Sequence, residues 1–155
     1  MKGGASFDRR GFDALVTRAQ KNVGGIRLTV GVHRGTQNKS TDIALYAGAN
    51  NYGVKKNGVQ RIPARNFMGF SADRINEFMN SPKYDRLLAK FALGQISREA
   101  VIKIIGETTV SITRKTIRDS SLYAPNAAIT KARKGSSKPL IASAVMLQTV
   151  SWRKG

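Results

Sequence analysis

The stretch that most constrains the fold of this chain is residues 124–143, which read APNAAITKARKGSSKPLIAS. It has almost no apolar periodicity, and no Asp or Glu occurs anywhere after Asp119. A compact domain rarely contains about twenty such residues unless they are disordered or bind something. We therefore expect a folded body that presents an extended basic loop at about residues 119–139. The cations of this stretch are Lys131, Arg133, Lys134 and Lys138.

The composition indicates a small domain, residues 1–155, with a strong preference for negatively charged partners. The chain is 41% hydrophobic, which suits one domain around one core. It has 27 Lys and Arg against 9 Asp and Glu, a net charge of +18. A field of that size attracts polyanions: nucleic acid, an anionic membrane surface or an acidic protein. The charge alone does not choose among these partners.

No membrane or secretory segment is predicted. The chain has no apolar run that approaches the roughly 18–20 residues needed to span a bilayer. The N-terminus, MKGGASFDRRGF, lacks the apolar core of a signal peptide. We therefore expect an intracellular product with no membrane partner. The absence of cysteine excludes disulfides, thiolate metal sites and a cysteine nucleophile.

Hydrophobic spacing predicts an α+β fold, in which a small mixed sheet packs against several helices and carries long extended loops or arms. Ser6 or Asp8 is expected to cap a first helix. Strict alternation over residues 26–33 predicts a half-buried strand. A second helix is expected to begin at Thr41 or Asp42. The apolar face of the first helix is Phe12, Leu15, Val16, Ala19 and Val23.

The middle of the chain contains strong turn and breaker signals. Asn57-Gly58 predicts a tight turn, and Pro63 excludes a helix where it stands. A helical stretch is predicted from Ser71 and is broken at Ser81-Pro82.

The longest helix is predicted to begin after Ser97, which can cap it. A short helical turn at Ile141, Ala144 and Val145 and a final strand over residues 148–153 follow the basic loop. The predicted buried stripe of the long helix is Val101, Ile104, Ile105, Thr108 and Ile112. Its other side carries Arg98, Lys103, Arg114, Lys115 and Arg118.

The sequence does not predict a catalytic, cofactor or metal site. His33 is the single histidine, and no carboxylate or hydroxyl is placed near it by local sequence. Asp73 and Glu77 lie one helical turn apart, but solvated helix charges explain them better than a metal pair. No phosphate loop or nucleophile elbow is present. We therefore expect a binding protein rather than an enzyme such as a nuclease.

Two ordered motifs resemble the tail-completion or neck protein family of tailed bacteriophages, also described as minor tail protein Z-like or virion morphogenesis proteins. The resemblance covers residues 26–153. The middle motif of that family reads I-P-x-R-x-F and is matched by Ile62, Pro63, Arg65 and Phe67. Ala142 and Ala144 replace the usual Asp and Gly of the late motif. That motif is matched by Thr130, Lys134, Gly135, Ser136, Lys138, Pro139, Leu140 and Ile141.

The resemblance implies a structural virion protein that is assembled in the host cytoplasm and joins or finishes the tail at the head–tail junction. The expected assembly is a hexameric ring around the DNA channel, with a dodecamer as the second expectation. The partners would be other neck and tail proteins and the packaged DNA. The implied contacts between subunits or neighbours are Ile62, Pro63, Arg65, Phe67, Pro139, Leu140 and Ile141. The expected contacts to DNA or an acidic partner are Lys55, Lys56, Lys131, Arg133, Lys134 and Lys138.

An alternative from a different class is a free nucleic-acid-binding protein that uses residues 124–143 as its binding loop. Such a protein would bind DNA or RNA with a steep dependence on salt, because each neutralised phosphate releases counterions.

Overall fold

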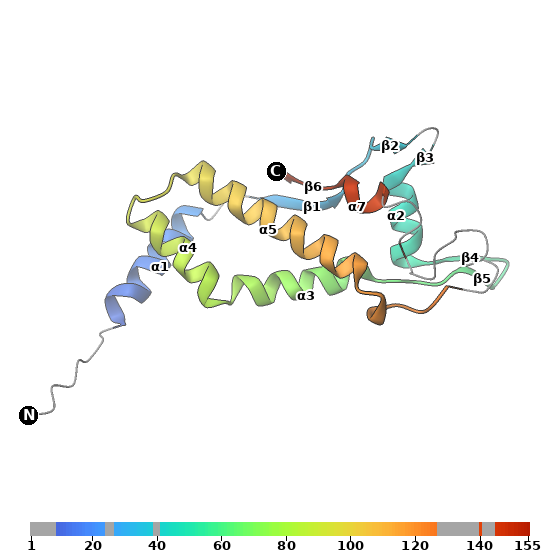
Figure 1. Ribbon diagram of the computed structural model, residues 1–155, viewed down its shortest axis with the longest axis horizontal. Helices are drawn as coiled ribbons and strands as arrows, with labels where there is room; N and C mark the ends of the chain where they lie inside the picture. Colours follow the sequence, from blue (N-terminus) through green and yellow to red (C-terminus); the bar gives the residue numbers. More distant parts are fainter. Residues whose placement is uncertain (1–8, 24–26, 39–40, 127–139, 141–144) are drawn as a thin grey trace, which may run out of the picture.

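The computed structural model describes residues 9–23, 27–38, 41–126, 140 and 145–155 (Figure 1). The α+β class predicted from the sequence is confirmed. The helices are α1 (Arg10–Val23), α2 (Ile43–Tyr52), α3 (Phe67–Met79), α4 (Pro82–Ala92), α5 (Arg98–Arg118), the 3-10 helix η1 (Ser120–Leu122) and α7 (Val145–Thr149). The strands form antiparallel pairs: β1 (Leu28–Val32) with β6 (Val150–Lys154), β2 (Gln37–Asn38) with β3 (Thr41–Asp42), and β4 (Val54–Lys56) with β5 (Val59–Ile62).

Helix α5 is the central element of the fold. It runs along the long axis of the molecule beside α3, and the β1–β6 pair packs on it as well (Figure 1). The predicted final strand is confirmed as β6, which sets Trp152 opposite Val30 in the register with β1. Helices α1 and α4 pack together at one end, and α2 with the β4–β5 hairpin lies at the other.

The apolar interior consists of two clusters along α5. The first joins α2, α3, η1 and α7, and α5 contributes Val110 and Ile117 to it. The second joins α1 and α4, and α5 contributes Val101 and Ile105. Since one helix supplies residues to both clusters, it connects the two ends of the molecule. The predicted face of α1 enters the second cluster through Ala19, which is fully buried, while Ser6 and Asp8 lie outside the described residues.

The buried face of α5 differs from the predicted stripe. Val101 and Ile105 are buried as expected, but Ile104 is 42% exposed. The interior side instead contains threonines whose hydroxyls bond within the helix: Thr113 Oγ1 donates to the carbonyl of Thr109 at 2.9 Å. A hydroxyl satisfied in this way can be buried at little cost. The buried residues of α5 are Val101, Ile102, Ile105, Gly106, Thr109, Val110, Thr113, Thr116 and Ile117.

Capping residues fix where the helices begin, and several predictions are confirmed. Asp42 accepts a hydrogen bond from the backbone N–H of Ala44 at 2.8 Å, and Ser97 caps α5. Ser81 caps α4, with proline in its first turn as predicted. The predicted start of α3 at Ser71 is wrong. The helix begins four residues earlier because Asn66 caps it through its side chain.

Strand β6 is held against α5 by contacts that depend on one glycine. Gly106 lies directly under Trp152, where a Cβ atom would be 2.3 Å from Cδ2 of the indole. The indole Nε1 donates to Glu107 Oε1 at 3.2 Å. Arg114, predicted on the polar side, is half-buried and donates to the carbonyls of Gln148 and Val150. These contacts fix the C-terminal strand across the middle of α5.

Candidate functional site

Arg65 of the middle motif holds the chain that leads into the basic stretch. Its Nη2 donates to Asn126 Oδ1 at 3.0 Å, and its Nε donates to the carbonyl of Ala124 at 3.4 Å. The backbone N–H of Arg65 donates to the carbonyl of Asn50 at 2.9 Å. Burial lowers the pKa of the Arg65 guanidinium, and nearby Tyr46 opposes that shift. An arginine keeps its proton even so, and it therefore acts as a charged clamp on residues 124–126.

The residues just before Ala124 are also fixed to the body. Tyr123 is buried and its hydroxyl donates to the carbonyl of Thr116 at 2.6 Å, while burial raises its pKa to about 12. Asp119 accepts a hydrogen bond from Arg74 Nη2 at 2.7 Å, and this bond lowers the pKa of the carboxyl. The expected extended loop at residues 119–139 therefore needs correction: its first part is η1 and buried side chains, because Tyr123 and Asn126 find partners on α5 and at Arg65.

The chain enters the core again at Leu140. This residue is 3% exposed and belongs to the same cluster as Ile43, Ala47 and Phe67. Its φ of 63° is unfavourable for a residue other than glycine, by roughly 1–2 kcal/mol. Complete burial of a leucine contributes about 1.5–3 kcal/mol, enough to offset that cost. Asn126 and Leu140 are thus two buried anchors, one on each side of residues 127–139.

The structure gives the residues of the two motifs different surroundings. Arg65, Phe67 and Leu140 are enclosed by their own chain, so their side chains serve the interior. Ile62 and Pro63 are half-buried at the end of the β4–β5 hairpin, and a contact with a neighbour stays a prediction for them. The remaining predicted contacts lie outside the described residues: Lys131, Arg133, Lys134, Lys138, Pro139 and Ile141.

The β4–β5 hairpin projects from the body beside the end of α2 (Figure 1). Its turn is the predicted Asn57-Gly58, with φ of 52° and 76°, as a type I′ turn requires. Lys55 and Lys56 are exposed, and so are Val54 at 37% and Val59 at 56%. An isolated two-stranded hairpin is only marginally stable in water, so exposed valines on it indicate a surface that another element can cover.

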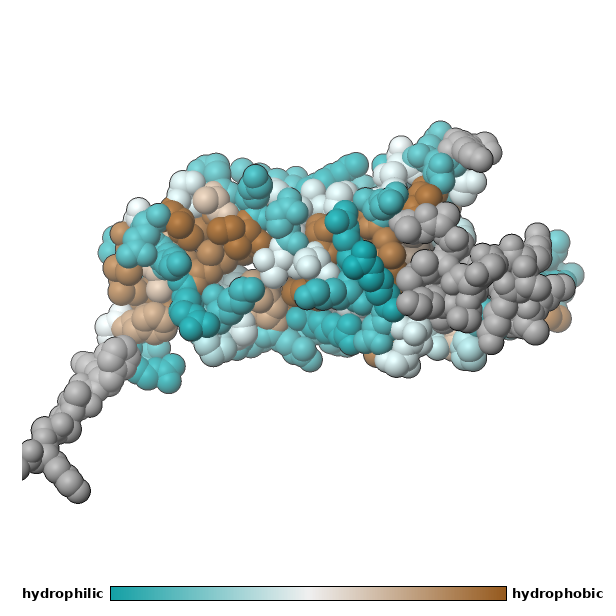
Figure 2. All heavy atoms as spheres, viewed as in Figure 1, coloured by the Kyte–Doolittle hydropathy of each residue, from teal (hydrophilic) through white to brown (hydrophobic). Residues whose placement is uncertain are grey.

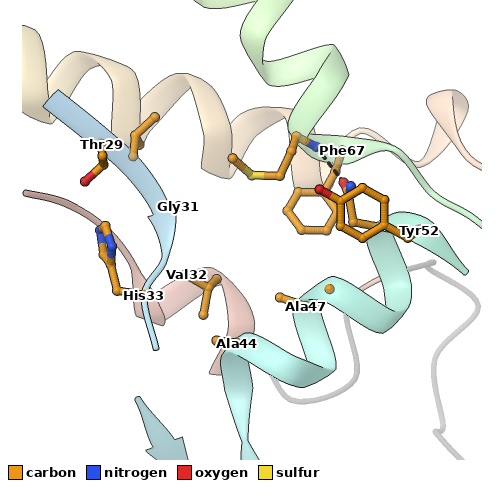
Figure 3. A pocket seen from close by; sticks show the side chains of 12 residues that line it. Thr29, Gly31, Val32, His33, Ala44, Ala47, Tyr52 and Phe67 are labelled. Carbon is orange, nitrogen blue, oxygen red and sulfur yellow. Dashed lines mark hydrogen bonds between the residues drawn. The ribbon is translucent and has the colours of Figure 1, made fainter. Parts of the chain in front are cut away.

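A pocket of about 250 Å³ lies between β1, α2 and the start of α3 (Figure 3). Asn51 Oδ1 accepts the backbone N–H of Met68 at 3.0 Å at its rim. His33 lies beside β1, away from Phe67 and Ala47, and its Nε2 is 3.2 Å from the carbonyl of Ser151. Among the described residues that line the pocket there is no carboxylate, so none of them places an acid beside the imidazole.

Some residues around the anchors give no signal in the sequence. Asn126 looks like any polar loop residue, and nothing near it indicates that Arg65, far away in the chain, would bind its side chain. Tyr123 gave a weak signal as the one aromatic residue close to the basic stretch. The cations of α4, Lys83, Arg86 and Lys90, could have been found from their helical spacing of three and four.

Comparison with known proteins does not assign the chain: no family model, no curated protein and no solved structure matches it. Among the described helices, none is both long and apolar enough to cross a membrane. Over the same described ranges, no three His, Cys, Asp or Glu side chains gather as they would around a metal ion.

Proposed function

We propose that this chain is a structural virion protein that forms a ring, with six copies as the first expectation, at the head–tail junction of a tailed bacteriophage. In this role it binds neck and tail proteins around the DNA channel and acts without catalysis. The proposal rests on the resemblance of its two motifs to the tail-completion and neck family.

The observation that carries the proposal is the linkage between the two motifs inside one chain. Arg65 of the middle motif clamps Asn126, and Leu140 of the late motif lies in the same buried cluster as Phe67 of the middle motif. Both motifs therefore serve to hold the two ends of the basic stretch on the body. A protein that must offer a cation-rich segment to DNA or to an acidic neighbour needs such fixed points, because positioning in advance reduces the ordering entropy lost on binding.

The exposed hairpin supports assembly in a second way. Val54 and Val59 lie on it beside Lys55 and Lys56, so it combines apolar surface with positive charge. A contact between this hairpin and a different surface of the next copy would be heterologous. Heterologous contacts generate rings when the rotation closes.

The test is the mass of the purified full-length chain by light scattering, together with mass spectrometry of particles made by the genome that encodes it. We expect a ring-sized oligomer and a virion-associated copy. Val59→Thr should raise the protein concentration needed for assembly roughly tenfold, the effect of about 1.4 kcal/mol. Leu93→Thr is the matched control, because Leu93 is equally exposed at 57% but lies far along the chain. A chain that stays monomeric and is absent from particles would refute the proposal.

The nucleic-acid-binding alternative gives a different result. A free nucleic-acid-binding protein would stay monomeric and bind duplex DNA with an affinity that falls steeply as salt rises.

A further inference from the structure

A groove between α4 and α5 combines an apolar floor with a basic rim. It encloses about 250 Å³. Figure 2 shows hydrophobic surface over the end of the molecule where α4 and α5 meet, bordered by hydrophilic residues. The lining consists of Phe78, Leu87, Ile104 and Thr108 on the floor and Lys83, Arg86 and Lys90 on the rim.

The floor is open to solvent within the described part of the molecule. Ile104, in the N-terminal third of α5, is 42% exposed, and Phe78 and Leu87 are half-buried. Pockets for cofactors and drug-sized ligands usually enclose about 300–1,000 Å³, so this groove is small for them. It suits the insertion of one or two apolar side chains from a macromolecule.

The rim provides charge in a defined pattern. Lys83, Arg86 and Lys90 are spaced three and four residues apart, so they follow one face of α4 over about 10 Å, at 1.5 Å per residue. All three are exposed, and no described carboxylate forms an ion pair with them. Asp85 lies on the opposite side of α4 by helical geometry. The positive charge beside the apolar floor is therefore not neutralised by its own helix.

We propose that this groove is the docking site for an acidic amphipathic helix of a partner protein. A helix laid between two helices places apolar residues at positions i, i+3, i+4 and i+7 on the floor. Acidic residues on its flank, spread over two turns, would face the three cations. This inference is independent of the ring assembly proposed above.

Charge and apolarity together select this occupant over others. Nucleic acid would use the three cations, but its phosphates gain nothing from Ile104 and Leu87 on the floor. A second copy of the chain is a poor donor of acid, since it carries 9 Asp and Glu against 27 Lys and Arg. Among those few acids, Asp42 caps α2, Glu107 bonds to Trp152 and Asp119 is paired with Arg74.

The test measures binding of a fluorescent synthetic peptide to the full-length protein by polarisation. The peptide has about 18 residues, long enough to be helical, with Leu at i, i+3, i+4 and i+7 and Glu on both flanks. A scrambled peptide of the same composition removes the amphipathic face and keeps the charge. We expect the amphipathic peptide to bind at least about tenfold more tightly than the scrambled one.

Protein variants then locate the binding. Changing Lys83, Arg86 and Lys90 together to Glu should weaken binding at least about tenfold. The matched control changes Arg34, Arg153 and Lys154 to Glu, which alters the net charge equally at exposed positions of the β1–β6 region. This control variant should lose much less affinity for the peptide. Ile104→Ala should weaken binding of the amphipathic peptide and leave binding of polyglutamate unchanged, because it alters the floor alone.

Three outcomes would overturn the proposal. One is equal binding of the scrambled peptide, which would mean that charge alone accounts for the affinity. Another is a loss of peptide affinity in the control variant as large as the loss in the triple variant of the groove, which would mean that the peptide binds elsewhere. The third is loss of self-association when Lys83, Arg86 and Lys90 are changed to Glu, which would make a second copy of the chain the occupant of the groove. In the first two cases, unchanged light-scattering masses would leave the ring proposal intact.

Discussion

The contact of Gly106 with Trp152 makes a prediction in which two known effects oppose each other. Alanine is the best helix former and glycine among the worst, so Gly106→Ala should favour α5 by about 0.8–1 kcal/mol. A Cβ at this position would, however, lie 2.3 Å from Trp152 Cδ2 and 2.5 Å from Cε2. Comfortable carbon contacts begin near 3.5 Å, so the indole would have to move by roughly 1.2 Å.

The steric effect should outweigh the helix propensity. Forcing an extra methyl group into a packed contact costs typically 1–3 kcal/mol. Movement of the indole would also weaken its bond to Glu107 and its packing opposite Val30 on β1. The expected net result is a loss of about 1–2 kcal/mol in the free energy of unfolding.

A double-mutant cycle separates the two effects. In a Trp152→Ala background the obstacle is absent, so Gly106→Ala should stabilise the protein by up to about 1 kcal/mol. Urea unfolding followed by circular dichroism is the assay, because Trp152 is the single tryptophan and cannot serve as a probe in both backgrounds. Gly48→Ala in α2, where a Cβ meets nothing within 4 Å, is the control and should be stabilising. A stabilising Gly106→Ala in the wild-type background would refute the reasoning.

Two further predictions concern the anchors of the basic stretch. Arg65→Met should lower the free energy of unfolding by about 2–4 kcal/mol in a urea titration, since it removes the buried guanidinium that donates to the side chain of Asn126 and to the carbonyl of Ala124; an unchanged midpoint would contradict the clamp. Burial raises the pKa of Tyr123 to about 12, against about 10 for an unfolded tyrosine. Above pH 10 the unfolded chain loses this proton while the folded chain keeps it, so the stability is complete below pH 10 and falls as the pH rises toward 12. In unfolding titrations at pH 8–11, the free energy of unfolding of Tyr123→Phe should fall less steeply with pH than that of the wild type. The same slope in both proteins would count against burial of the neutral phenol.

Much of the local structure could be predicted from the sequence because short-range chemistry determines it. Asp42 and Ser97 cap their helices through their own side chains, and Asn57-Gly58 adopts the positive φ angles that the hairpin needs. The β6 strand follows from the alternation that sets Val150 and Trp152 on one face. Such signals act within a few residues of their position, so no knowledge of the tertiary fold is required.

The candidate site could be predicted only in part, because it depends on contacts between distant segments. The motif containing Arg65 was found, but its role as an internal clamp depends on Asn126, 61 residues away. The buried face of α5 was missed for a related reason. Thr109 and Thr113 count as polar in a hydrophobic pattern, yet each bonds to its own helix and can therefore be buried. Ile104, apolar and expected inside, is instead 42% exposed on the floor of the groove between α4 and α5.

The anchors at Asn126 and Leu140 have a consequence for how this protein can vary. Folding of the body already brings the two ends of the intervening chain to fixed positions. For a connection that makes no contacts of its own, doubling its length would cost only about 0.6 kcal/mol in closure entropy. In such a connection, insertions, deletions and changes of charge would therefore accumulate without loss of the fold. The same body could serve as a scaffold on which the reach and the charge of a binding segment are altered independently of stability.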